Sequence, residues 1–223
     1  MNPLRWLSGR CLACDLPTRS HRDLCSICYA DLPWCEAVPG SLTPAQRVIA
    51  PLFFQGGVRD WIHRLKYHRG WVEGEVLGSV LADAIAANYL PNAAELGLPQ
   101  PWQHPPSAIV PVPMPRLSWL LRGHNPATVL ARPVAKRLRL PVLETLVHRA
   151  PKRQDQHNLS RAERHRSMRS AFSVTAQPPA RVAIVDDVLT TGATCQALSQ
   201  TLIDAGCAEV HIWCSAYTPP QAC

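Results

Sequence analysis

The sequence contains no long hydrophobic run. None of its apolar stretches approaches the roughly 18 uninterrupted residues that a membrane-spanning helix needs, so no membrane span is expected. The first ten residues, MNPLRWLSGR, also lack the apolar region of about 7–15 residues that is typical of an export signal. We therefore expect a cytoplasmic protein with reduced cysteines.

Two common nucleotide-binding motifs are missing as well. No GxxxxGK(S/T) phosphate loop occurs and no GxGxxG sequence opens a predicted helix, which disfavours P-loop nucleoside triphosphatases and Rossmann dehydrogenases. No internal repeat is present. With 223 residues, of which 47% are hydrophobic, the chain is large enough for one or two domains with a substantial core.

Four of the nine cysteines form two CxxC pairs near the N-terminus, Cys11 with Cys14 and Cys25 with Cys28. Two such pairs can supply four thiolates to a tetrahedral Zn²⁺ ion, and two disulfides are the alternative. A segment of about 40 residues buries too little apolar surface to fold alone, so we expect structural zinc in a module over residues 1–42. Cys35 lies just beyond the second CxxC pair and could replace one of the four cysteine ligands.

A second informative segment covers residues 182–194, VAIVDDVLTTGAT. Residues 182–185 are apolar and β-branched, as in a buried parallel strand, and Gly192 precedes a predicted helix. Asp186 and Asp187 follow the strand, where two carboxylates can accept from ribose hydroxyls or approach Mg²⁺. The following turn provides backbone N–H groups, hydroxyls and a helix N-terminus for a phosphate; it consists of Thr190, Thr191, Gly192, Ala193 and Thr194.

The remaining pattern alternates between strands and helices. Strands are expected at 48–54, 107–112, 143–147 and 209–215, and helices at 57–67, 73–89, 126–139 and 193–205, with a basic helical or mixed stretch at 161–169. Trp61, Ile62 and Leu65 have the spacing of a buried helix face. The alternation predicts an α/β fold with a parallel sheet covered on both faces over residues 43–223, and ligands that bind at the carboxyl ends of its strands.

Much of the net charge of +7 lies in one segment. Residues 149–169 contain seven lysines or arginines against Asp155 and Glu163. This segment is either a solvated face or a loop that closes over a polyanion, which would be a pyrophosphate or a nucleic-acid backbone. A second basic cluster, at residues 59–69, mixes cations with aromatic rings as single-strand-binding surfaces do.

The 182–194 segment resembles the phosphoribosyl-pyrophosphate (PRPP) signature of type I phosphoribosyltransferases. Further motifs occur in order along the chain, so the sequence as a whole resembles the ComF/GntX family of competence-associated, phosphoribosyltransferase-like proteins. These motifs are the two CxxC pairs, Leu65-Lys66-Tyr67, Pro111-Val112-Pro113, Arg122-Gly123-His124-Asn125, Gln156 with its basic neighbours, and Ala171-Phe172.

The resemblance implies a type I phosphoribosyltransferase-like fold and assigns roles to the motif residues. Asp186 and Asp187 would orient the ribose at the catalytic centre, while residues 190–194 would hold the 5′-phosphate. Arg116 and Arg122 would donate to the diphosphate, which arrives with Mg²⁺. Residues that would contact phosphate or DNA from the basic segments are Lys66, Arg149, Lys152, Arg153 and Gln156. The Arg122–Asn125 motif can equally be a helix-capping turn, with Asn125 as the N-cap and Pro126 at the first helical position.

Two functions follow from the resemblance. The first is an accessory protein of DNA uptake in natural transformation, which binds PRPP and single-stranded DNA and works with competence or DNA-processing proteins. The second is an active phosphoribosyltransferase, a glycosyltransferase that acts on a small acceptor the sequence does not identify. Family members commonly carry threonines beside the loop glutamine, where this chain has Arg153 and Asp155, and this difference leaves the activity open.

Overall fold

The computed structural model describes residues 9–20, 22–36, 42, 44–45, 47–88, 105–150 and 171–219. Its main sheet has the strand order β1-β7-β6-β3, with β2 also paired to β7, and every pairing in it is parallel. The strands are β1 (Arg47–Ile49), β2 (Leu52–Phe53), β3 (Ala108–Pro111), β6 (Arg181–Leu189) and β7 (Glu209–Tyr217). A separate antiparallel pair consists of β4 (Val147–Arg149) and β5 (Phe172–Val174).

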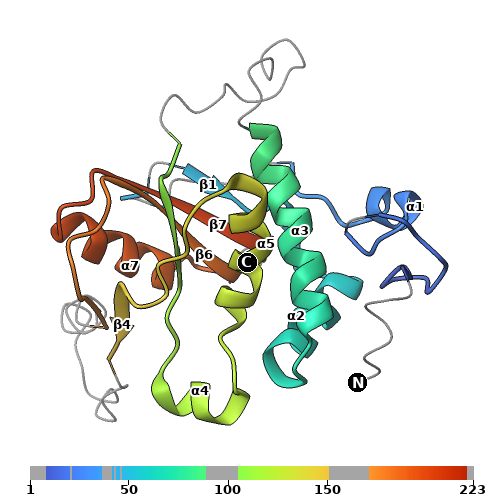
Figure 1. The fold of residues 1–223 in the computed structure, drawn as a ribbon, viewed down its shortest axis with the longest axis horizontal. Coiled ribbons are helices and arrows are strands. Elements are labelled where there is room, and N and C mark those ends of the chain that lie inside the picture. The colour runs from blue at the N-terminus through green and yellow to red at the C-terminus, as the bar shows by residue number, and fades with distance from the viewer. Residues whose placement is uncertain are drawn as a thin grey trace.

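Helices cover both faces of the main sheet, as predicted for an α/β fold (Figure 1). One face packs against α2 (Gly56–Tyr67), α3 (Trp71–Asn88) and α5 (Pro126–Leu138), and the other against α7 (Ala193–Asp204). Successive residues of β6 alternate between the two cores: Ala183 and Val185 belong to the first, Val182 and Ile184 to the second. This two-residue period, in strands that are apolar throughout, is the expected consequence of burial on both faces.

Helix α2 confirms the predicted buried face. Trp61, Ile62 and Leu65 are 8%, 1% and 0% exposed. Helix α3 packs closely on α5 because Gly78 has no side chain: a Cβ atom there would lie 2.7 Å from the carbonyl oxygen of Leu130 and 2.6 Å from Cγ of Pro133. Among the described residues, no helix is both long enough and apolar enough to cross a bilayer.

Two sequence predictions were wrong in detail, and one helix was not predicted. The single strand expected at 48–54 is two short strands, β1 and β2, separated by Ala50 and Pro51, because proline has no N–H to donate to a ladder. The strand expected at 143–147 is instead β4, which starts at Val147. The segment after Val112, for which no helix was predicted, contains the helix α4 (Arg116–Arg122), which projects at the bottom of Figure 1.

The cysteine-rich N-terminal segment lies beside α3 and includes the short helix α1 (Ser26–Ala30) (Figure 1). Its last residues pair with the edge of the sheet. The N–H of Cys35 donates to the carbonyl oxygen of Pro51 and the N–H of Phe53 donates to that of Pro33, both at 2.7 Å. Trp34 forms an antiparallel bridge with Leu52. The expected stretch at 161–169 lies outside the described residues.

Candidate functional site

The acidic pair lies where β6 extends beyond its neighbour β3. The two strands pair as far as Pro111 and Val185, and the N–H of Val112 then donates to the carbonyl oxygen of Val185 at 2.9 Å. Strand β6 continues through Asp186 and Asp187 to Leu189, two residues further than the acidic pair. A crevice therefore opens beside the two carboxylates, at the carboxyl ends of parallel strands, where open α/β sheets bind ligands.

The two carboxyl groups have different surroundings. Asp187 is 8% exposed, and its Oδ1 lies 2.8 Å from Nζ of Lys66, at the end of α2. Asp186 accepts a hydrogen bond of 2.9 Å from the N–H of Asp187. Burial and then the neighbouring negative charge of Asp187 raise the pKa of Asp186 to about 7, although Lys66 and Arg149 act in the opposite direction. Burial beside a second carboxyl group thus favours the protonated form of Asp186 more than in an exposed aspartate.

The turn after β6 has the form expected of a phosphate-binding loop. Gly192 is the N-cap of α7 and adopts a left-handed conformation with φ 74°. This conformation favours glycine, whereas a Cβ atom there would meet only the end of the Leu42 side chain, at 2.5 Å from its Cδ2. The N–H of Ala193 donates to Oγ1 of Thr191 at 3.4 Å. Thr190 and Thr191 are exposed, and Thr194 lines the same cavity as the acidic pair.

Besides Lys66, two of the predicted cations lie at this cavity. Arg122 ends α4, with its Cζ 4.9 Å from the ring centroid of Tyr67, and Arg149 ends β4, with its Cζ 5.4 Å from that of Phe172. Arg116 begins α4, and its side chain is outside what the structure describes. The predicted residues Lys152, Arg153 and Gln156 also lie outside the described residues.

The turn between α4 and α5 holds these elements together. Asn125 is the N-cap of α5, as predicted: its Oδ1 accepts from the N–H of Ala127 at 3.1 Å. Its Nδ2 also donates to the carbonyl oxygen of Val112 at 3.0 Å, which ties the start of α5 to the end of β3. The buried ring of His124 lies with Nε2 2.7 Å from the carbonyl oxygen of Leu65.

Sequence reasoning did not assign the positioning contacts of His124 and Asn125, nor the place of Tyr67 at the cavity. The Arg-Gly-His-Asn motif was the available signal.

The cavity measures about 270 Å³, slightly below the roughly 300–1,000 Å³ common for small-molecule sites. Its charged and polar lining includes Lys66, Tyr67, Ser118, Arg122, Asn125, Arg149, Asp186, Asp187 and Thr194. Such a small polar space, with cations opposite carboxylates, suits a compact phosphorylated ligand.

The four N-terminal cysteines form a second site. The Sγ atoms of Cys11, Cys14, Cys25 and Cys28 all lie within 4.8 Å of one another. A tetrahedral zinc ion with Zn–S bonds of about 2.3 Å would separate its sulfurs by about 3.8 Å, so the cluster could hold a metal ion such as zinc. The N–H of Cys28 donates to Sγ of Cys25 at 3.4 Å. Cys35 is not part of the cluster, and no disulfide joins the cysteines that the structure describes.

Fold and sites together define the class of protein: an α/β protein with an acidic pair at the end of a parallel strand and a potential metal-binding cluster of four cysteines near its N-terminus. No protein-family model matches the chain. It is 29% identical to the DNA utilization protein YhgH of Escherichia coli K12 over 216 residues, which is 94% of this chain and 91% of that protein.

The chain is also 36% identical to competence protein F of Haemophilus influenzae over 112 residues, which is about half of each protein (48% and 49%). The YhgH protein of Salmonella typhi is 28% identical over 94% of this chain and 97% of its own length. These similarities support a ComF-family protein.

Proposed function

We propose that this protein is an accessory factor of DNA uptake in natural transformation, which binds PRPP in the cavity of the acidic pair and contacts single-stranded DNA. Relatives that match over nearly the whole chain are named DNA utilization proteins, and another is named a competence protein. The observation that carries PRPP binding is the convergence of Asp186, Asp187, Thr194 and two arginines on one cavity of about 270 Å³.

The chemistry of PRPP matches that lining. The 5′-phosphate would lie at the turn of residues 190–194, where the N-terminus of α7 and threonine hydroxyls can donate to it. The diphosphate would lie toward Arg122 and Arg149, because guanidinium groups form paired hydrogen bonds with phosphate oxygens. The carboxylates of Asp186 and Asp187 would accept from the ribose hydroxyls between these two ends.

Magnesium fits the same donor set, because carboxylate and phosphate oxygens are the ligands it prefers. Asp186 and Asp187 would hold it together with the ligand's own oxygens, and the ion would neutralise charge on the diphosphate. Asn125 and His124 act as positioning residues, since they fix the turn that presents Arg122.

PRPP binding is tested by calorimetric titration of PRPP with Mg²⁺ into the protein and into the Asp186→Asn, Asp187→Asn double variant. We expect micromolar affinity, about 8 kcal/mol of binding free energy, that the variant loses. The matched control is Asp60→Asn with Asp204→Asn, which removes the same charge at exposed helix positions. Absence of binding by the folded wild type, or equal loss in both variants, would refute PRPP binding at this site.

An active phosphoribosyltransferase is the second candidate, favoured by the near-neutral pKa of Asp186 in a cavity lined with cations. The reaction would displace pyrophosphate from the anomeric carbon of the ribose through an oxocarbenium-like state, and Arg122 and Arg149 would stabilise the leaving group. It predicts pyrophosphate release that depends on PRPP and on a base or amine acceptor. No release across a broad acceptor panel, by protein shown to bind PRPP, would exclude it.

For the cysteine cluster we propose structural zinc. The surrounding segment forms only one short helix among its described residues, and Cys11 is fully buried, so the metal would replace a hydrophobic core.

DNA contact predicts that affinity for an oligonucleotide falls steeply as salt rises, since cations on the protein displace counterions from phosphates. Affinity that does not change between low and high salt would refute this contact.

A further inference from the structure

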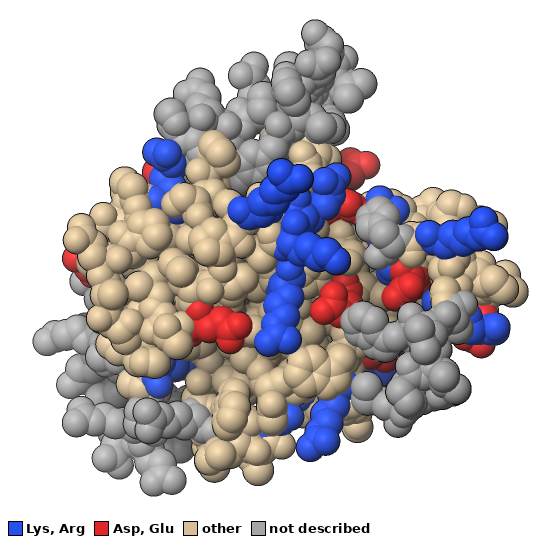
Figure 2. Space-filling model, viewed as in Figure 1, with Lys and Arg blue, Asp and Glu red and all other residues tan. Residues whose placement is uncertain are grey.

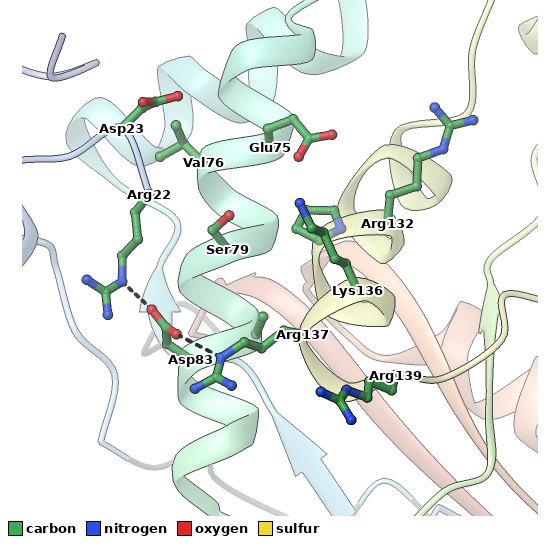
Figure 3. Close-up of a pocket in the computed structure, with 12 residues that line it drawn as sticks. Arg22, Asp23, Glu75, Val76, Ser79, Asp83, Arg132, Lys136, Arg137 and Arg139 are labelled. Carbon is green, nitrogen blue, oxygen red and sulfur yellow. Dashed lines mark hydrogen bonds and ion pairs between the residues drawn. The ribbon is translucent and has the colours of Figure 1, made fainter. Parts of the chain in front are cut away.

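A groove separate from the acidic site runs between α3 and α5 beside the cysteine-rich segment (Figure 3). Its volume is about 840 Å³, and none of its lining residues also lines the cavity of the acidic pair. One wall is formed by α5 and carries Arg132, Lys136 and Arg137, with Arg139 just past the helix end. Figure 2 shows basic side chains gathered in a column on this face of the molecule.

Two cations of the groove already have an acidic partner. Asp83 on α3 pairs with Arg22 of the cysteine-rich segment and with Arg137, whose Nε lies 3.8 Å away (Figure 3). Arg22 and Arg137 therefore have a structural role, because their ion pairs with Asp83 join three segments of the chain.

The other three cations form a line along α5. Arg132 and Lys136 are four residues apart and share one face of α5, and Arg139 follows as the C-cap residue of that helix in a left-handed conformation. All three are exposed, and no ion pair between them and a described carboxylate lies within 4.0 Å. Like charges at this spacing on a helix oppose folding. The helix dipole favours cations only in the last turn, which does not include Arg132.

The groove also contains carboxyl groups, which are Asp23, Glu75 and Asp83. Burial is the main cause that raises the pKa of Glu75, and the charges of Arg132 and Lys136 partly oppose the rise. Five lysines or arginines line the groove against these three carboxyl groups, so its lining carries an excess of cations. Such a surface attracts a linear chain of anions that can contact successive cations.

We propose that this α5 groove binds the phosphodiester backbone of single-stranded DNA, and that it is the principal DNA contact of the described part of the chain. The proposal rests on the DNA contact proposed above and adds its location. The three cations are spread along the groove, so successive phosphates of one strand can contact them. They form a single row, which matches the single row of phosphates of one strand.

The test is fluorescence anisotropy of a labelled single-stranded oligonucleotide, measured over a range of salt concentrations with zinc-loaded protein. The groove variant combines Arg132→Gln, Lys136→Gln and Arg139→Asn; asparagine is chosen because Arg139 has φ 56°. The control variant combines Arg59→Gln, Arg64→Gln and Arg69→Asn, which removes three exposed charges from the competing basic cluster on and after α2. Melting curves and zinc content confirm that both variants remain folded.

We expect the groove variant to bind at least tenfold more weakly, with a logarithmic salt slope reduced by about 2, at roughly 0.7 per lost phosphate contact. The control variant should retain affinity within about twofold. Equal losses of affinity in both variants, or a loss in the control variant alone, would refute the groove as the principal DNA-binding site, although the protein would still bind DNA. A wild type that does not bind single strands would instead refute the proposed DNA contact. Tighter binding of a duplex than of a single strand would overturn the choice of ligand.

Discussion

The ion pair between Lys66 and Asp187 should be a strong link between α2 and the acidic end of β6. Lys66 Nζ and Asp187 Oδ1 are 2.8 Å apart, and the two side chains are only 26% and 12% exposed. Replacing Lys66 with glutamine would leave Asp187 beside Asp186 without its cation. Replacing Asp187 with asparagine costs less, because the long lysine side chain can reach water.

The expected magnitude follows from the geometry. Two unit charges at this distance attract with about 6 kcal/mol at an effective dielectric constant of about 20. Desolvation and the ordering of the lysine offset most of this, which leaves a coupling free energy of about 1–2 kcal/mol. Lys66→Gln alone should lower the free energy of unfolding by about 2 kcal/mol and the melting temperature by about 4–8 °C.

A double-mutant cycle of Lys66→Gln and Asp187→Asn, measured by urea unfolding, isolates the pair. The control cycle is Arg59→Gln and Asp60→Asn, whose atoms are 3.9 Å apart and whose side chains are 65% and 66% exposed. The control coupling should fall below about 0.5 kcal/mol. If the Lys66–Asp187 coupling is equally small, the pair is not a strong link between α2 and β6, and this expectation is refuted.

Three further perturbations have defined outcomes. Cys25→Ser should abolish binding of about one zinc per chain, measured by atomic absorption, together with the folded state, whereas Cys35→Ser should retain the metal. Burial lowers the pKa of His211 to about 4, so its unfolded form takes up a proton first as pH falls and stability is lost from about pH 6.5 downward. His211→Gln should therefore remove about 2 kcal/mol of the stability difference between pH 7 and pH 5, and an unchanged pH profile by urea unfolding would contradict this. In thermal melts Gly78→Ala should destabilise the protein by about 1–3 kcal/mol, because the added Cβ atom clashes with α5. Gly57→Ala should stabilise it by about 0.5–1 kcal/mol, because a Cβ atom there meets nothing nearer than 4.0 Å. A change of the same sign in both variants would contradict the packing argument.

Elements with a strong local signal could be predicted from the sequence. The apolar run before Asp186 predicted β6, and the order Asn125-Pro126 predicted the start of α5, because caps and buried runs depend on a few adjacent residues. The two CxxC pairs likewise predicted a cluster of four sulfurs. Each of these patterns could be recognised in the sequence because the residues that form the pattern also form the cap, the strand or the cluster itself.

Contacts between distant segments could not be predicted in the same way. The Lys66–Asp187 pair depends on how α2 packs against β6, and nothing near either residue indicates the other. Helix α4 exposes Leu117 (69%), Leu120 (71%) and Leu121 (81%), so it has no amphipathic pattern that marks it as a surface helix. The groove depends on Asp83 pairing with Arg22 and Arg137 across three segments.

The pairing of residues 33–35 with β2 has a consequence for any attempt to shorten the chain. These residues occupy the outer edge of β2, where an unpaired strand would otherwise offer its N–H and C=O groups to other molecules. Removing the cysteine-rich segment would uncover that edge as well as delete a metal site. We expect the shortened protein to self-associate through the exposed edge of its sheet, so the N-terminal segment protects the protein from aggregation by covering that edge.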